Sequence, residues 1–231
     1  MVDKNGIILQ KQLSTMIKIY LNTFASLFGI RSEKSLERAI ARMVENQEAP
    51  FWYSRIRHGV RSFFVENMNY SILDSLLDKL ELVVPKTSFQ KNDCENSKQV
   101  LRMIYEMPFD SLEGKTMLKP AAKSIPFYGI ELEVNPDAII TWKDQQGRYH
   151  VGAIKTKLKK SVFRKEEATM IACMIKRYLE TLFPEYVVED SYCICYDAFR
   201  SKFYRVNNYT NNLILASTIA QRIAAMAPEA A

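Results

Sequence analysis

Two apolar segments joined by a short polar turn constrain the fold of this chain more than any other part of the sequence. Ala138–Trp142 and Tyr149–Leu158 each have the length of a strand, and the Lys143–Arg148 segment between them, KDQQGR, is polar and contains a glycine. Apolar runs of this length, separated by such a turn, are typical of a β-hairpin. The sequence therefore predicts that the two segments pair as antiparallel strands.

Further strands are expected on both sides of this hairpin. Phe127–Val134 is predicted to add a third antiparallel strand, and Ser191–Ala198 and Lys202–Val206 two more. Between them, Lys165–Phe183 has the most regular helical period in the chain. We expect its apolar stripe to pack on the sheet; the stripe comprises Ala168, Ile171, Ala172, Ile175, Tyr178, Leu179 and Leu182.

The first half of the chain is predicted to be helical, and a last helix is expected near the C-terminus. Proline, glycine and lysine punctuate the sequence after residue 107, where the character changes from helical to strand-like. We therefore expect an α+β chain with a helical part over 1–107, packed on or beside a core over 108–231. The expected helices are Ile8–Leu27, one opened by Ser32, one started by Pro50, Ser71–Leu82, Ser97–Glu106 and Asn211–Met226, with Lys86–Asn96 as a loop.

Composition narrows the class of protein. The chain has 231 residues, 48% of them hydrophobic, which suits a folded protein of one domain or one domain with a helical extension. Its formal net charge is +6, and a basic balance favours a polyanionic partner such as nucleic acid. No apolar run is long enough to span a bilayer and no signal-peptide layout is present, so we expect a cytoplasmic protein without a membrane partner.

An acid and a lysine stand at defined places in the predicted strand pair. Pro136 and Asp137 come directly before the first strand, and Lys155 lies within the second. Because side chains alternate between the two faces of a strand, Lys155 shares its face with Ala153 and Lys157. We expect that face to look toward Asp137, which would bring a carboxylate and an ammonium together.

This pattern resembles the PD-(D/E)XK nuclease superfamily over about residues 127–206, under half of the chain. The resemblance implies a restriction-endonuclease-like mixed β-sheet core flanked by helices. It also implies that Asp137 binds Mg²⁺ or Mn²⁺ and that Lys155 acts on the attacking water or the phosphate. A chain of this kind would be a metal-dependent nuclease that cleaves DNA, or RNA, in restriction, defence or repair.

The sequence departs from the family pattern at one position. Ala153 stands where the family has Glu or Asp, and alanine cannot bind a metal. Either Glu167 or Glu166, at the start of the following helix, supplies the missing ligand, or the site has lost catalysis. In the second case the chain is a nuclease-fold module that binds nucleic acid or serves as a subunit. Other acids could reach the site or face solvent instead; they are Glu37 and Glu45, for which the solvated face of an amphipathic helix is favoured, and Glu131 and Glu133.

A run of basic residues follows the second strand of the hairpin. Lys157, Lys159, Lys160 and Arg164 suit a phosphate backbone, and the alternative is a solvated loop. The helical part, rich in Phe, Trp and Met, could form a surface for a homodimer or a partner protein, or ordinary core. The four cysteines lack a second paired cluster, so we expect buried structural thiols rather than a zinc site.

Overall fold

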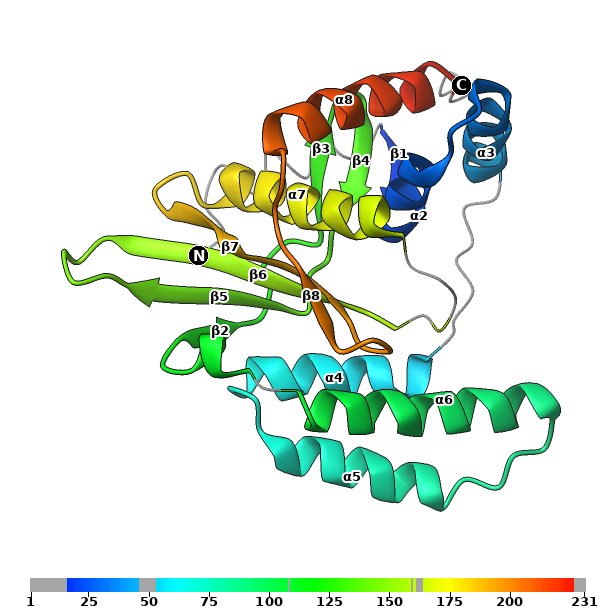
Figure 1. The fold of residues 1–231 in the computed structure, drawn as a ribbon, viewed down its shortest axis with the longest axis vertical. Helices are drawn as coiled ribbons and strands as arrows, with labels where there is room; N and C mark the ends of the chain where they lie inside the picture. The colour runs from blue at the N-terminus through cyan, green and yellow to red at the C-terminus, as the bar shows by residue number, and fades with distance from the viewer. Residues whose placement is uncertain (1–15, 46–52, 108, 159, 161–163, 227–231) are drawn as a thin grey trace.

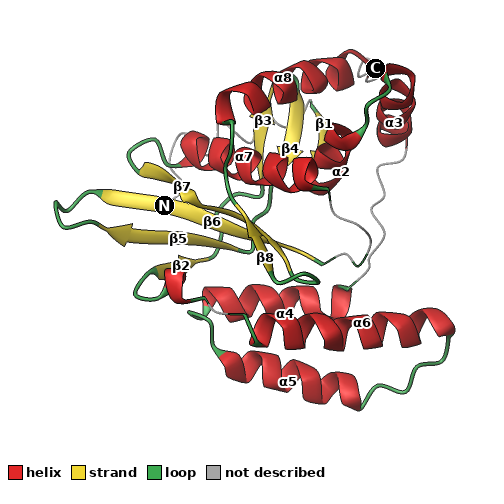
Figure 2. Cartoon of the chain, in the orientation of Figure 1, coloured by secondary structure: helices red, strands yellow, loops and turns green. Residues whose placement is uncertain are grey.

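The chain folds into stacked layers of helices and sheets. The computed structural model describes residues 16–45, 53–107, 109–158, 160 and 164–226. From bottom to top, Figure 1 shows the helices α4 to α6, a five-stranded sheet, the helix α7, a three-stranded sheet and the helix α8. The predicted α+β class, with a helical N-terminal part followed by a mixed sheet flanked by helices, is confirmed (Figure 2).

The larger sheet has the strand order β2-β5-β6-β7-β8. The predicted hairpin is confirmed, because β5 and β6 pair antiparallel from Ala138 opposite Ile154 to Lys143 opposite Tyr149. β6 and β7 run parallel, which requires a long crossover connection, and α7 provides it. The strands are β2 Thr116–Leu118, β5 Ala138–Lys143, β6 Tyr149–Lys157, β7 Val187–Asp197 and β8 Lys202–Tyr204.

The predicted third strand of this sheet is wrong. Within 127–134, Tyr128 and Gly129 both have positive φ, so the chain turns back in a two-residue hairpin and forms β3 Ser124–Phe127 and β4 Ile130–Glu133. These two strands belong to the smaller sheet, of order β1-β4-β3. The strand beside β5 in the larger sheet is instead β2.

The first predicted helix is wrong over part of its length. Residues 8–15 lie outside the described residues, but β1 Ile17–Tyr20 is a strand that pairs in parallel with β4. The helix α2 Leu21–Ser26 and the 3₁₀ turn η1 Leu27–Gly29 follow it. The strand state is decided by a partner more than 100 positions away along the chain, so the helical period alone could not predict it.

The helix α7, Lys165–Leu182, is the centre of the molecule. Most of its predicted stripe is buried in one apolar cluster with Val151, Ala153 and Cys193 of the larger sheet, as expected, and Leu182 is partly buried against this cluster. The opposite side is buried as well, because Met170 and Met174 join the same cluster, which also contains Leu132 of the smaller sheet. Buried apolar side chains thus cover two sides of α7, which lies between the two sheets, while its polar residues Lys176, Arg177 and Glu180 are partly exposed and form ion pairs.

Three helices cover the other face of the larger sheet, and they are α4 Ser54–Val65, α5 Tyr70–Glu81 and α6 Ser88–Tyr105. Phe63 and Leu101 share an apolar cluster with Ile154 and Tyr196 of the sheet. The prediction of a loop over Lys86–Asn96 is wrong, since the helix begins at Ser88. The hydroxyl of Thr87 accepts a hydrogen bond from the backbone of Gln90, at 3.1 Å, and this cap starts a polar surface helix that hydrophobic periodicity does not detect.

The remaining elements lie mostly at the ends of the layers. They are α3 Glu33–Glu45, which follows Ser32 as predicted, η2 Asp110–Leu112, and α8 Tyr209–Met226. Pro50, the predicted start of the third helix, lies outside the described residues. The division at residue 107 stays a prediction, although elements from both sides of it contribute to both apolar clusters.

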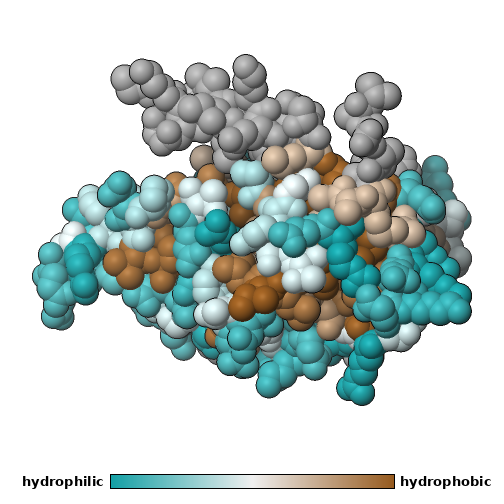
Figure 3. All heavy atoms as spheres, turned by 90° about the horizontal axis from the view of Figure 1, so that it is seen from above, coloured by the Kyte–Doolittle hydropathy of each residue, from teal (hydrophilic) through white to brown (hydrophobic). Residues whose placement is uncertain are grey.

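The surface of the described part is mixed in character. Viewed from above, it is hydrophilic at both outer ends and carries apolar side chains between them (Figure 3). Ile214 and Leu215 of α8 are among the exposed apolar residues. Among the described residues, no helix is both long enough and apolar enough to cross a bilayer.

Candidate functional site

Asp137 and Lys155 meet at one end of the larger sheet. Asp137 directly precedes β5, and the ladder pairs the next residue, Ala138, with Ile154. The backbone N–H of Asp137 donates to the carbonyl of Ile154 at 2.7 Å, and its Oδ2 accepts from the backbone N–H of Thr156 at 2.6 Å. These bonds fix the carboxylate beside the backbone of β6, directly across from Lys155.

Lys155 is nearly enclosed, with an exposed fraction of 9%. Its Nζ donates to the backbone carbonyl of Asn135 at 2.8 Å. Burial lowers the pKa of the Lys155 ammonium to about 8; Asp137 opposes the shift, and the nearby Arg57 and Arg61 reinforce it. The site therefore holds an amine that titrates close to neutral pH.

Two arginines of α4 complete the surroundings of Asp137. Arg61 Nε lies 3.5 Å from Asp137 Oδ1, and Arg61 Nη2 donates to the carbonyl of Asn135 at 3.4 Å. The buried Nε makes a charge contact with the carboxylate but has no hydrogen-bond partner. Arg57 is exposed, and its charge acts on Lys155. The sequence gives no sign that these arginines belong to the site, because no motif links α4 to the hairpin.

Ala153, which stands where the family has an acid, does not lie across from Asp137 in the strand pair. Ala153 is fully buried, pairs with Ile139 and Cys193 on its two sides, and shares their apolar cluster. The residue across the ladder from Asp137 is Lys155. The strand pair therefore brings a lysine, not a second carboxylate, across from Asp137; the Lys155 ammonium donates to the Asn135 carbonyl, and the ion pair of Asp137 is with Arg61.

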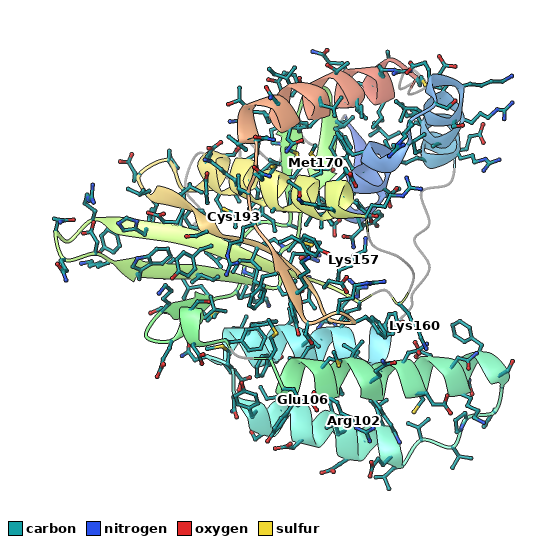
Figure 4. All side chains as sticks on the ribbon, viewed as in Figure 1. Arg102, Glu106, Lys157, Lys160, Met170 and Cys193 are labelled. Carbon is teal, nitrogen blue, oxygen red and sulfur yellow. The ribbon has the colours of Figure 1, made fainter. Side chains whose placement is uncertain are left out.

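Glu167 and Lys157 form a second buried pair beside the first. Lys157 Nζ lies 2.6 Å from Glu167 Oε1, and the two residues are 6% and 7% exposed. In Figure 4, Lys157 lies between the sheet and α7, the helix that carries Glu167. Glu166, the other candidate ligand, is exposed and lines an open groove of about 590 Å³ beside the start of α3.

The predicted basic run does not form one surface in the described part of the chain. Lys157 is inside, paired with Glu167, whereas Lys160 is exposed and donates to Asn96 of α6 at 3.2 Å. Arg164 is exposed and donates to the carbonyl of Gly29. Lys159 lies outside the described residues.

Three of the other candidate acids contact other residues, and the fourth, Glu45, is exposed. Glu37 lies 3.8 Å from Arg222 of α8, and Glu45 is exposed at the end of α3. Glu131 accepts a hydrogen bond from the hydroxyl of Ser124, and Glu133 is paired with Lys18 at 2.6 Å. These contacts place the four acids in or near the smaller sheet and the upper helices.

The carboxylates expected to bind Mg²⁺ or Mn²⁺ do not fit a metal as they are arranged. Asp137 faces Arg61 and the Thr156 N–H, and Glu167 faces Lys157. Among the described residues, no three His, Cys, Asp or Glu side chains come together as a metal group. The four cysteines are buried and none forms a disulfide, as predicted.

Comparisons with known proteins add no name to this arrangement. No protein-family model matches the chain, and no curated protein matches it. The function of the site is therefore inferred from its geometry.

Proposed function

We propose that this protein binds the phosphodiester backbone of a nucleic acid at the Asp137–Lys155 end of the larger sheet, without cleaving it. The observation that carries the proposal is the charge balance around Asp137. One carboxylate lies among three cations, Lys155, Arg57 and Arg61. The resulting excess of positive charge, partly buried, favours an anion rather than a second cation.

The chemistry of the cations fits phosphate. Arginine presents several N–H donors in a plane, which matches phosphate oxygens, and lysine adds a compact charge. Arg57 is exposed and Arg61 is partly exposed, so a ligand can reach them from solvent. Backbone contacts of this kind position a nucleic acid without reading its sequence. The net charge of +6 is consistent with such a partner, with DNA the expected form.

Metal-dependent cleavage of DNA or RNA is the second candidate, and one observation favours it. The pKa of Lys155 near 8 would allow this amine to exchange a proton close to neutral pH, as general acid–base catalysis requires. Cleavage would need the carboxylates to release the cations that now face them. The two candidate functions therefore predict different effects of adding Mg²⁺ or Mn²⁺ and of removing it with a chelator.

A binding assay with and without chelator separates them. Fluorescence anisotropy with labelled single- and double-stranded 20-mers of DNA and RNA should show binding that persists in EDTA. Arg61→Ala should weaken it about tenfold or more, because a hydrogen bond to a charged group contributes roughly 1.5–3 kcal/mol. Lys79→Ala, which removes an exposed lysine of α5, is the matched control and should leave the affinity unchanged.

The Asp137→Asn variant gives opposite outcomes for the two candidates. If the site binds phosphate without metal, removing the negative charge should keep or raise the affinity, because the cations lose a competitor. If the protein is a nuclease, Mg²⁺ or Mn²⁺ should support cleavage by the parent, and this variant should abolish it. Binding that disappears in EDTA would contradict the proposal.

A further inference from the structure

The turn that carries Asn135 connects the smaller sheet to the larger one. Asn135 lies between β4 and β5, followed by Pro136, and its φ is +42°. Left-handed backbone of this kind is disfavoured for most residues, and asparagine is one of the few that adopt it readily. The residue before a proline is restricted further, toward extended conformations. The conformation of Asn135 is thus held by its surroundings.

Two hydrogen bonds hold it. The backbone N–H of Asn135 donates to the carbonyl of Lys123 at 2.8 Å. The side-chain Nδ2 donates to Glu133 Oε1 at 3.1 Å, and Glu133 is itself held by Lys18. Together with the proline ring that follows, these contacts fix the direction of the Asn135 carbonyl.

That carbonyl accepts hydrogen bonds from two of the three cations of the site. Lys155 Nζ donates to it at 2.8 Å and Arg61 Nη2 at 3.4 Å. One oxygen therefore holds an ammonium from β6 and a guanidinium from α4 at the same point. The partial negative charge of the carbonyl also favours the charged form of a lysine that burial otherwise discourages.

We propose that Asn135 is the positioning residue of the anion site: its left-handed turn aims one carbonyl so that Lys155 and Arg61 point at a common phosphate. This inference rests on the proposed function for the identity of the anion. The arrangement of the two cations by the carbonyl does not depend on it.

A matched pair of substitutions tests the role of the turn. Asn135→Gly and Asn135→Ala both remove the hydrogen bond to Glu133, but only glycine accepts positive φ without a penalty. Alanine should relax the turn and rotate the carbonyl away from Lys155. We expect the alanine variant to bind the 20-mers about tenfold more weakly, a factor that lies within the range of the left-handed penalty. The glycine variant should bind like the parent.

A second measurement uses no nucleic acid. In protein labelled with ¹³C-lysine, the Cε signal of Lys155, assigned with Lys155→Arg, should titrate near pH 8 in the parent. The midpoint should fall in Asn135→Ala and stay in place in Asn135→Gly. Equal midpoints in all three proteins would overturn the positioning role. A midpoint that shifts as expected while the parent binds no oligonucleotide would refute the proposed function and support the role of Asn135.

Discussion

The two ends of the β5–β6 strand pair carry charge clusters of opposite character. At the inner end, Asp137 lies among Lys155 and the arginines of α4. At the outer end, the His150 ring lies between two carboxylates, with Nε2 3.0 Å from Asp144 and Nδ1 2.9 Å from Glu189. Cations outnumber acids at the first end, and acids outnumber the imidazole at the second.

The two clusters differ less in burial than in charge, because His150 and Asp137 are both 7% exposed. The hydrogen bond from His150 is the main reason that the pKa of Asp144 lies well below its usual range. Arg148, which also pairs with Asp144, is 64% exposed. Solvent screens only the rim of this cluster, where Arg148 and Glu189 lie. The same ladder thus ends in a site suited to hold an anion on one side and in a buried imidazole between two carboxylates on the other.

Breaking the buried Lys157–Glu167 pair at the inner end should have the largest effect on the free energy of unfolding. Lys157→Ala leaves Glu167 buried without its partner, and we expect the free energy of unfolding to fall by about 3–5 kcal/mol. Urea denaturation followed by circular dichroism measures it. The double variant Lys157→Met with Glu167→Leu should lose much less, because no isolated charge remains. Equal losses in both would show that packing, not charge, controls this end.

The pH dependence of stability should reveal Lys155. Its pKa is lowered from 10.5 to about 8 on folding, so between these values the unfolded chain binds more protons than the native protein. The contribution of Lys155 to the stability therefore rises with pH across this window, by an amount on the order of 2–3 kcal/mol. Raised pKa values of other groups, such as the Cys195 thiol, act in the opposite direction. The measurement is the stability of the parent minus that of Lys155→Met, from pH 7 to 10.5, and a flat difference would contradict the buried ammonium.

The middle of the ladder should respond to a single added methyl group. A Cβ on Gly152 would lie 2.4 Å from the Cβ of Tyr192 and 2.6 Å from its carbonyl oxygen. We expect Gly152→Ala to lower the free energy of unfolding by about 1–3 kcal/mol, since the backbone cannot move aside cheaply. Gly147→Ala, in the open turn with φ of +78°, tests backbone conformation without a clash. If Gly152→Ala leaves the free energy of unfolding unchanged, β7 must be able to move away from β6 at Tyr192.

A substitution at the outer end of the strand pair should have the smallest effect on stability. Arg148→Ala removes an exposed partner of Asp144, and we expect the midpoint of urea denaturation to stay within experimental error. It should also leave nucleic-acid binding unchanged. A loss of affinity comparable to that of Arg61→Ala would place the binding surface at the outer end of the strand pair and contradict the proposed anion site.

The sequence predicted the parts of the fold that local patterns determine. The hairpin and α7 follow from strand-length apolar runs and from helical periodicity, which neighbouring residues supply. β1 and β2 were missed because their pairing partners lie far along the chain. The start of α6 was missed because a polar helix with a threonine cap has no hydrophobic stripe in its first turns.

The candidate site, like the fold, was predicted only in part. Asp137 and Lys155 were brought together as expected, because both belong to one hairpin. Arg61 and Asn135 were missed, since a contact between α4 and a turn 74 residues later leaves no periodic signal. The strand register, which assigns the place opposite Asp137 to Lys155, also required the structure. Whether Glu167 ever serves a metal stays a prediction.

The enclosed position of α7 has a consequence for how the molecule comes apart. Both sheets and the helices α2 and α8 pack against this one helix, so neither sheet can keep its core while the other separates from it. Partial opening would expose apolar surface on both sides of α7 at once. The upper and lower halves of this region should therefore be lost in a single cooperative step, with amides of α7 exchanging their hydrogens only when the whole region unfolds.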